Sequence, residues 1–253
     1  MIIPGLVSVT FRDRTAEWII KQCQRAGLKA VEWSENIHVF PDDEAGADHL
    51  YRQTTAAGLS VAAYGSYYRL GEQEAPAEVF GRSLRSAAAL RAPVIRIWAG
   101  TKPSLEVGEA EFDRLAEEAV LIAELAQKEG VKCALEWHRN TLTDTNETAM
   151  KLLHKADHPN LYCLWQPTVA LSMAERIEGL RFLAERGRLL NLHMYYWRGE
   201  IRRPLEEGVS EWQQYLSVID PQEDRYGLME FVMDGTEEQF LADAGILHRL
   251  LEL

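Results

Sequence analysis

The sequence predicts a single (β/α)8 barrel spanning residues 1–253. Eight short segments of β-rich composition alternate with longer segments of helical periodicity. Eight units in 253 residues leave about thirty residues for each one, the size of a strand-helix-strand crossover. An open doubly wound sheet is the alternative, but no G-x-G-x-x-G or Walker A loop follows any of the segments.

The predicted strands recur along the whole chain. They are residues 6–10, 30–34, 60–65, 94–100, 133–138, 161–166, 189–197 and 227–233. The sequence shows no linker, low-complexity tract or shift in composition between them, so one domain accounts for the chain.

Helices are expected between these strands. The clearest lies at residues 109–130, where apolar residues recur close to helical spacing. Gly27, Gly58 and Gly130 precede strands and are typical of the left-handed residue that ends a helix. Residues 198–227 are less regular, and we expect a loop and a short helix there, over the barrel mouth.

Composition restricts the partners. A net charge of −12 and a pI near 5.1 would repel a nucleic-acid backbone. The chain has no apolar run of roughly 18 residues and its first residues do not resemble a signal peptide, so we expect no membrane partner and a cytoplasmic location. Three cysteines without a C-x-x-C pair suit reduced thiols. The sequence is compatible with a homo-oligomer.

Polar residues gather at the predicted strand ends, which is where a barrel of this type places its active site. Charged side chains inside a barrel are costly unless they are paired or bound to a metal, so several at one level indicate a shared polar centre. Alternate positions along the strands give Glu32, Ser34, Arg96, Trp98, Glu136, His138, Gln166, His193, Tyr195 and Glu230.

Four of these residues form a candidate metal site. Glu136, Gln166, His193 and Glu230 come from the fifth to the eighth predicted strand, one from each. Two carboxylates, an imidazole and an amide oxygen suit one divalent ion, such as Mg²⁺, Mn²⁺, Zn²⁺ or Co²⁺. The alternative is that each residue faces water or pairs with an arginine.

At these residues the sequence resembles the xylose isomerase-like TIM-barrel family of sugar isomerases and epimerases. The resemblance is most specific in VIRIWAG, ALEWH, NLHMYYW and GLMEF. It implies that Glu136, His193 and Glu230 bind one divalent metal. The family has an aspartate after the sixth strand, where this chain has Gln166. An amide oxygen brings no charge, so we expect weaker metal binding than in a site with that aspartate.

The resemblance also implies a reaction. Glu136 and Glu230 would be the catalytic carboxylates, one removing a proton beside a carbonyl and the other returning it, through an enediolate that the metal stabilises. Return of the proton to the opposite face gives an epimerisation, and return to the neighbouring carbon gives an aldose-ketose isomerisation.

The substrate is expected to be a small sugar, sugar phosphate or polyol. Aromatic side chains near the strand ends suit the apolar faces of sugar rings. Two of the candidate residues also have structural interpretations. His138 is equally typical of a surface loop, and Arg96 could serve to neutralise a glutamate. The residues assigned to substrate binding are His138, Arg96, Trp98, Tyr195 and Glu32.

Two other functions fit the same residues. A metal-dependent dehydratase of a cyclic hydroxy-ketone such as dehydroshikimate would begin with the same proton abstraction and then expel a hydroxyl group. A non-catalytic sugar-binding protein could have lost its metal, as Gln166 suggests. A DNA-repair enzyme of this fold fits poorly, because such enzymes resemble histidine-rich zinc sites on basic surfaces.

Overall fold

Eight parallel strands close into a barrel in the computed structural model, which describes residues 1–252. The order around the barrel is β1-β10-β7-β6-β5-β4-β3-β2, and pairing of β1 with both β2 and β10 closes it. This arrangement confirms the predicted (β/α)8 barrel. The barrel strands are β1 (Ile2–Val7), β2 (Ala30–Ser34), β3 (Ser60–Arg69), β4 (Val94–Trp98), β5 (Lys132–Glu136), β6 (Leu161–Trp165), β7 (Leu189–Met194) and β10 (Arg225–Met229).

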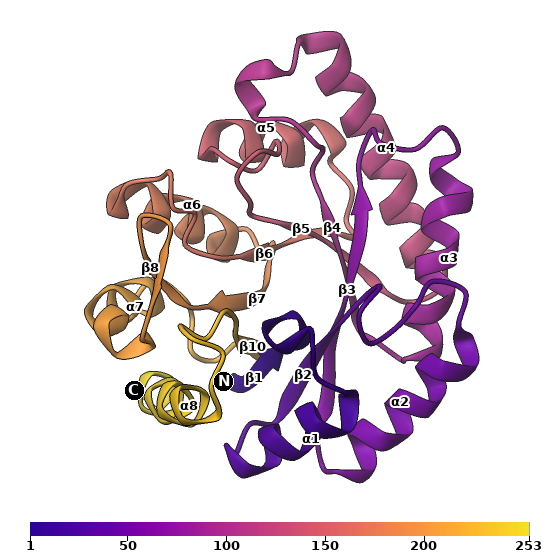
Figure 1. The fold of residues 1–253 in the computed structure, drawn as a ribbon. Coiled ribbons are helices and arrows are strands. Elements are labelled where there is room, and N and C mark those ends of the chain that lie inside the picture. The colour runs from indigo at the N-terminus through magenta and orange to yellow at the C-terminus, as the bar shows by residue number, and fades with distance from the viewer. Residues whose placement is uncertain (253) are drawn as a thin grey trace.

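Helices surround the strands, and the two termini lie side by side near α8 (Figure 1). Gly27, Gly58 and Gly130 have φ angles of 70°, 76° and 71°, so the predicted helix ends are confirmed. No helix in residues 1–252 has the length and apolar character needed to cross a membrane. The helices are α1 (Ala16–Arg25), α2 (Glu44–Ala56), α3 (Pro76–Ala89), α4 (Glu109–Lys128), α5 (Asn146–Ala156), α6 (Met173–Glu185), α7 (Val209–Leu216) and α8 (Glu237–Leu251).

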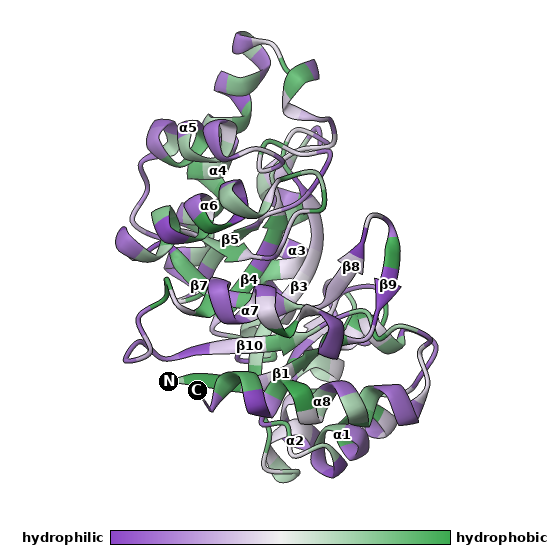
Figure 2. Cartoon of the chain, turned by 90° about the vertical axis from the view of Figure 1, so that its left-hand side faces the viewer, coloured by the Kyte–Doolittle hydropathy of each residue, from purple (hydrophilic) through white to green (hydrophobic). Residues whose placement is uncertain are grey.

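Apolar residues lie mainly in the strands and on the inward faces of the helices, and polar residues on their outward faces (Figure 2). Between the strands and the helices lie the largest buried side chains, including Trp33, Trp137 and Trp165. Trp165 makes edge contacts with Trp212 and Tyr215 of α7, with centroids 6.1 and 5.0 Å apart. The core therefore packs against the outside of the barrel.

The first strand lies earlier than predicted. Residues 6–10 were expected, but β1 is Ile2–Val7, and Ser8–Phe11 form a 3-10 turn, η1. Pro4 and Gly5 hide the strand pattern in the sequence. Gly5 is required because a Cβ there would lie 2.6 Å from the Ala30 carbonyl oxygen on β2.

The seventh strand is shorter than predicted, since residues 189–197 divide at Tyr195. The strand ends at Met194, and β8 (Tyr196–Arg198) pairs antiparallel with β9 (Ile201–Arg203) to form a hairpin outside the barrel. After this hairpin, a further 3-10 turn, η3 (Leu205–Gly208), leads into α7. The helix expected over the mouth is α7, and it lies instead between α6 and α8 in the outer ring.

Candidate metal and active site

Polar side chains from six strands meet inside the barrel at its carboxyl end. They are Glu32, Arg96, Glu136, Gln166, His193 and Glu230, all buried. Two residues earlier on five of these strands, the buried side chains are apolar: Ala30, Val94, Ala134, Leu164 and Leu228. The alternation of the strands thus places a polar layer above an apolar one.

Glu136, His193 and Glu230 bring three ligand atoms within 4.8 Å of one another. The Nδ1 atom of His193 lies 3.6 Å from Glu136 Oε1 and 3.7 Å from Glu230 Oε2. Within the described chain His193 Nδ1, Glu230 Oε2 and Gln166 Oε1 are buried without a hydrogen-bond partner. Unsatisfied buried donors and acceptors are costly, so His193 Nδ1 and Glu230 Oε2, 3.7 Å apart, fit a divalent ion as their common partner.

Glu32 holds His193 from the side opposite this cluster. Its Oε2 atom lies 3.0 Å from His193 Nε2, and a carboxylate there favours a proton on Nε2, which leaves Nδ1 free to bind a metal. The space for Glu32 depends on Gly65 of β3, because a Cβ there would lie 2.8 Å from Glu32 Oε1 and 3.0 Å from an Arg96 nitrogen. Every atom of the Glu32 side chain is buried.

The two candidate catalytic carboxylates have different surroundings. Glu136 accepts hydrogen bonds from Trp98 Nε1 and from Gln166 Nε2 at 2.9 Å, and it lies 3.3 Å from Arg96 Nε. Burial opposes ionisation, but Arg96 and His193 outweigh it and hold the pKa of Glu136 well below its ordinary value. Burial, together with the carboxylates of Glu136 and Glu32, raises the pKa of Glu230 to about 8.

His193 is protonated more readily than an ordinary histidine. Burial lowers its pKa, but the carboxylates of Glu32 and Glu230 raise it well above the usual value. In the metal-free protein an imidazolium therefore stands among the glutamates. A metal ion at Nδ1 would have to displace that proton.

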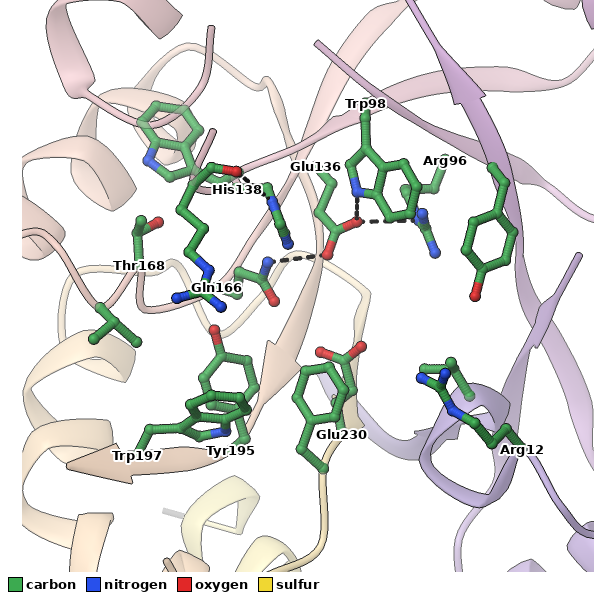
Figure 3. A pocket seen from close by; sticks show the side chains of 16 residues that line it. Arg12, Arg96, Trp98, Glu136, His138, Gln166, Thr168, Tyr195, Trp197 and Glu230 are labelled. Atoms are coloured by element: carbon green, nitrogen blue, oxygen red, sulfur yellow. Dashed lines mark hydrogen bonds and ion pairs between the residues drawn. The ribbon is translucent and has the colours of Figure 1, made fainter. Parts of the chain in front are cut away.

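A cavity of about 310 Å³ opens above the polar layer (Figure 3). Glu136, Glu230 and Gln166 face its open space in Figure 3. Its aromatic walls are Tyr67, Trp98, Tyr195, Trp197 and Phe231, and its other lining residues include Arg12, Arg96, His138, Arg139 and Thr168. This size and mixture of surfaces suit a small polar molecule.

Phe231, in one wall of the cavity, has an unusual backbone conformation. Its φ angle is 58°, a left-handed conformation that costs energy for a bulky residue. The ring makes edge contacts with Tyr195 and Trp197, with centroids 5.7 and 5.5 Å away. The turn follows Glu230 directly and ends the strand where that carboxylate enters the site.

The family model described as xylose isomerase-like TIM barrel matches residues 20–240. The chain belongs to the xylose isomerase-like TIM-barrel family. This match confirms the resemblance that the strand-end motifs indicated.

Solved structures share the fold of this xylose isomerase-like barrel at low sequence identity. The probable 3-DHS dehydratase AsbF of Bacillus anthracis superposes with a TM-score of 0.78, at 18% identity over 98% of this chain and 99% of that one. An L-ribulose 3-epimerase gives 0.76, at 15% identity over 100% and 95%. The IolI protein with a bound zinc atom gives 0.73, at 12% identity over 99% and 98%.

Among curated proteins, a 3-dehydroshikimate dehydratase of Bacillus anthracis is 39% identical over 67 residues. The match spans 26% of this chain and 24% of that protein.

The structure brings most of the predicted site residues of this xylose isomerase-like barrel together. Arg96, Trp98, Glu136, His138, Gln166, Tyr195 and Glu230 all line the cavity. His193 lies beneath it, fully buried, with its ligand atom near two of the glutamates. Glu32 was assigned to substrate binding but does not line the cavity, because its carboxylate is turned toward His193 and Arg96 below.

Arg12 and Phe231 are among the lining residues that were not found from the sequence. Arg12 follows η1, and the misplaced first strand concealed its position at the mouth. It is the first charged residue of the chain, which could have drawn attention to it. Phe231 follows Glu230 directly, but only its left-handed backbone explains why consecutive residues serve the same cavity.

Proposed function

We propose that this protein is a metal-dependent isomerase or epimerase of a small sugar, sugar phosphate or polyol. The observation that carries this proposal is the convergence of Glu136, His193 and Glu230, with ligand atoms within 4.8 Å, beneath a cavity of about 310 Å³. Gln166, whose Oε1 is buried and unpartnered, is the fourth ligand in this proposal. A divalent ion held there would supply Lewis acidity to adjacent carbonyl and hydroxyl oxygens of a substrate.

Glu230 is the residue best suited to accept a proton from carbon. Its carboxylate faces the cavity in which a substrate would lie (Figure 3), and in the metal-free protein burial raises its pKa to about 8. Glu136 accepts two hydrogen bonds and lies beside Arg96, and these contacts favour its ionised form. In an epimerisation Glu136 would have to take up a proton from solvent before returning it to the opposite face, whereas in an aldose-ketose isomerisation Glu230 could return the proton it removed to the neighbouring carbon.

His138 can bind a substrate hydroxyl group. Its Nδ1 atom lies 2.6 Å from the carbonyl oxygen of Arg139, which only accepts, so Nδ1 carries a proton. In the neutral ring Nε2 is then left to accept a hydrogen bond from a ligand. The ring stands 5.9 Å from that of Trp98, whose half-buried face offers an apolar surface beside this acceptor.

Dehydration of a cyclic hydroxy-ketone is the second candidate, and the 67-residue match to a 3-dehydroshikimate dehydratase favours it. Glu230 would again remove the proton beside the carbonyl. The β-hydroxyl would then leave with a proton as water, and a carbon-carbon double bond would form. The two reactions share their first step, so only the product distinguishes them.

The test is incubation of the protein, loaded with Mn²⁺, with a panel of ketoses in deuterated water and separately with dehydroshikimate. The proposed function predicts deuterium at the carbon beside the carbonyl, read by NMR, and an epimer or isomer as product. Loss of water from dehydroshikimate, followed by ultraviolet absorbance, would instead establish the dehydratase. A protein that takes up no metal and binds a sugar unchanged would establish the non-catalytic alternative.

A further inference from the structure

Three arginines line the cavity, and two of them are paired with acids. Arg96 lies 3.3 Å from Glu136, and Arg139 lies 2.7 Å from Glu200. The third, Arg12, is exposed and makes no hydrogen bond or ion pair with any residue between 1 and 252. In Figure 3 its side chain extends from the segment after β1 toward the open space that Glu230 faces.

The polar layer below does not need the charge of Arg12. With a divalent ion in place, the ion and Arg96 together balance the carboxylates of Glu32, Glu136 and Glu230. Gln166 adds no charge where the family has an acid. The guanidinium of Arg12 therefore remains available for a negative group that arrives with the substrate.

Two further arginines add positive charge around the cavity walls. Arg69 lies over the ring of Trp98 at 4.0 Å, and Arg202 lies over the ring of Phe231 at 4.7 Å. Neither side chain forms an ion pair within the part of the chain that the structure describes. In a protein with a net charge of −12, cations gathered around one cavity would attract an anion locally.

We propose that the substrate carries a carboxylate or phosphate group and that Arg12 binds it. The inference rests on the proposed function and names the substrate class of that site. A guanidinium suits both anions because its N–H groups can bind two oxygens at once. The neutral polyhydroxy part of the substrate then lies toward Glu136 and Glu230, and the anionic group lies toward η1.

The test compares three ligands that differ only at one carbon: D-glucose, D-glucuronate and D-glucose 6-phosphate. Their dissociation constants are measured by calorimetry with the Mn²⁺-loaded protein and with the metal-free protein. We expect one of the two anions to bind roughly 10- to 100-fold more tightly than glucose, as charge-assisted hydrogen bonds provide. The stronger of the two identifies the anion as carboxylate or phosphate.

Arg12→Gln should abolish this preference and leave the affinity for glucose unchanged, while Arg12→Lys should retain part of it. The matched control is Arg14→Gln, which removes the same charge two residues away from a side chain that does not line the cavity. Thermal unfolding should be unchanged in all three variants, because both arginines are exposed. Equal affinity for the three ligands, including no binding of any, would overturn the inference, as would an equal loss in Arg14→Gln.

Failure of the anion site and failure of the proposed isomerase function would give different results. An anion preference that depends on Arg12, in a protein that exchanges no substrate proton with solvent, would leave the anion site standing and remove the isomerase. Exchange into neutral ketoses at rates unaffected by Arg12→Gln, without any anion preference, would remove the anion site alone.

Discussion

Consecutive residues of the barrel strands point to opposite faces of the barrel, and the two faces carry different kinds of side chain. The inward face carries the ionisable residues of the site, and the outward face carries tryptophans that pack beneath the helices. Neighbouring residues that divide in this way are Glu32 and Trp33, Glu136 and Trp137, and Gln166 and Trp165. Because side chains alternate along a strand, a residue of the site and a residue of the core can be direct neighbours in the sequence.

The energetic consequences of the two faces are opposite. Buried aromatic side chains stabilise the fold through apolar area and ring contacts. Buried charges are expensive to place in the barrel, so replacing Glu230, which has no arginine partner, by its amide should change stability little. Substitutions on the outward face should therefore lower the stability of the fold and leave the site intact. Substitutions on the inward face should impair metal binding or catalysis more than they lower stability.

The largest effect is expected from Glu230→Gln. The variant keeps the shape of the side chain but cannot accept a proton, so solvent-deuterium exchange into substrate should fall by roughly 10²–10⁴-fold or more. Its thermal unfolding should match that of the original protein. Glu238→Gln, which removes an exposed charge at the start of α8, serves as the control and should exchange normally. Retained exchange in Glu230→Gln would remove Glu230 from the mechanism.

The outward face is tested by Trp165→Ala. Loss of the ring against Trp212 and Tyr215 should lower the free energy of unfolding by about 3–5 kcal/mol, measured by urea denaturation. Metal affinity of the folded protein should stay the same. Trp197→Ala, at the half-buried wall of the cavity, should have a much smaller effect on unfolding. A large loss of metal affinity in Trp165→Ala would contradict the separation of the two faces.

Glu32→Gln should weaken the metal site indirectly. Without the carboxylate at 3.0 Å, the His193 ring is oriented less firmly and its Nδ1 is less basic. Metal affinity should fall by roughly 10- to 100-fold, measured by titration with Mn²⁺. Because Glu32 does not line the cavity, sugar binding by the metal-free variant should not change. A change in sugar binding with unaltered metal affinity would restore Glu32 to the substrate site.

The smallest effect expected is a pH dependence of the metal-free protein. Glu230 has its pKa raised to about 8 and His193 has its pKa raised, so the folded state holds these protons more tightly than the unfolded chain. The stability due to them is present at low pH and is lost as the pH rises toward about 8. Metal ions must displace the same protons, so the rise in melting temperature on adding Mn²⁺ should grow over this range. A constant rise would contradict the assignment.

The sequence predicted the repeated pattern well because strand and helix periods are local properties. All eight barrel strands and the glycines that end three helices could be found in this way. The first strand was misplaced because Pro4 and Gly5 break its pattern, and their fit depends on the neighbouring strand. The hairpin after Tyr195 was missed because the apolar run continues through the point where the chain leaves the barrel.

The sequence predicted which residues form the site but not which of their atoms contact one another. Strand parity places Glu136, His193 and Glu230 inside, yet it does not say which atoms of His193 face which glutamates. The role of Glu32 depends on the direction of its carboxylate across the barrel, which is a tertiary property. Arg12 has no partner that a local pattern could reveal.

We propose that Glu136, Gln166, His193 and Glu230 together hold one divalent ion. Calorimetric titration of the purified protein with Mn²⁺, alongside the Glu136→Gln variant, tests it directly. We expect one ion bound per chain of the original protein and binding at least roughly tenfold weaker in the variant. No Mn²⁺ binding by the original protein, or equal binding by both, would contradict it.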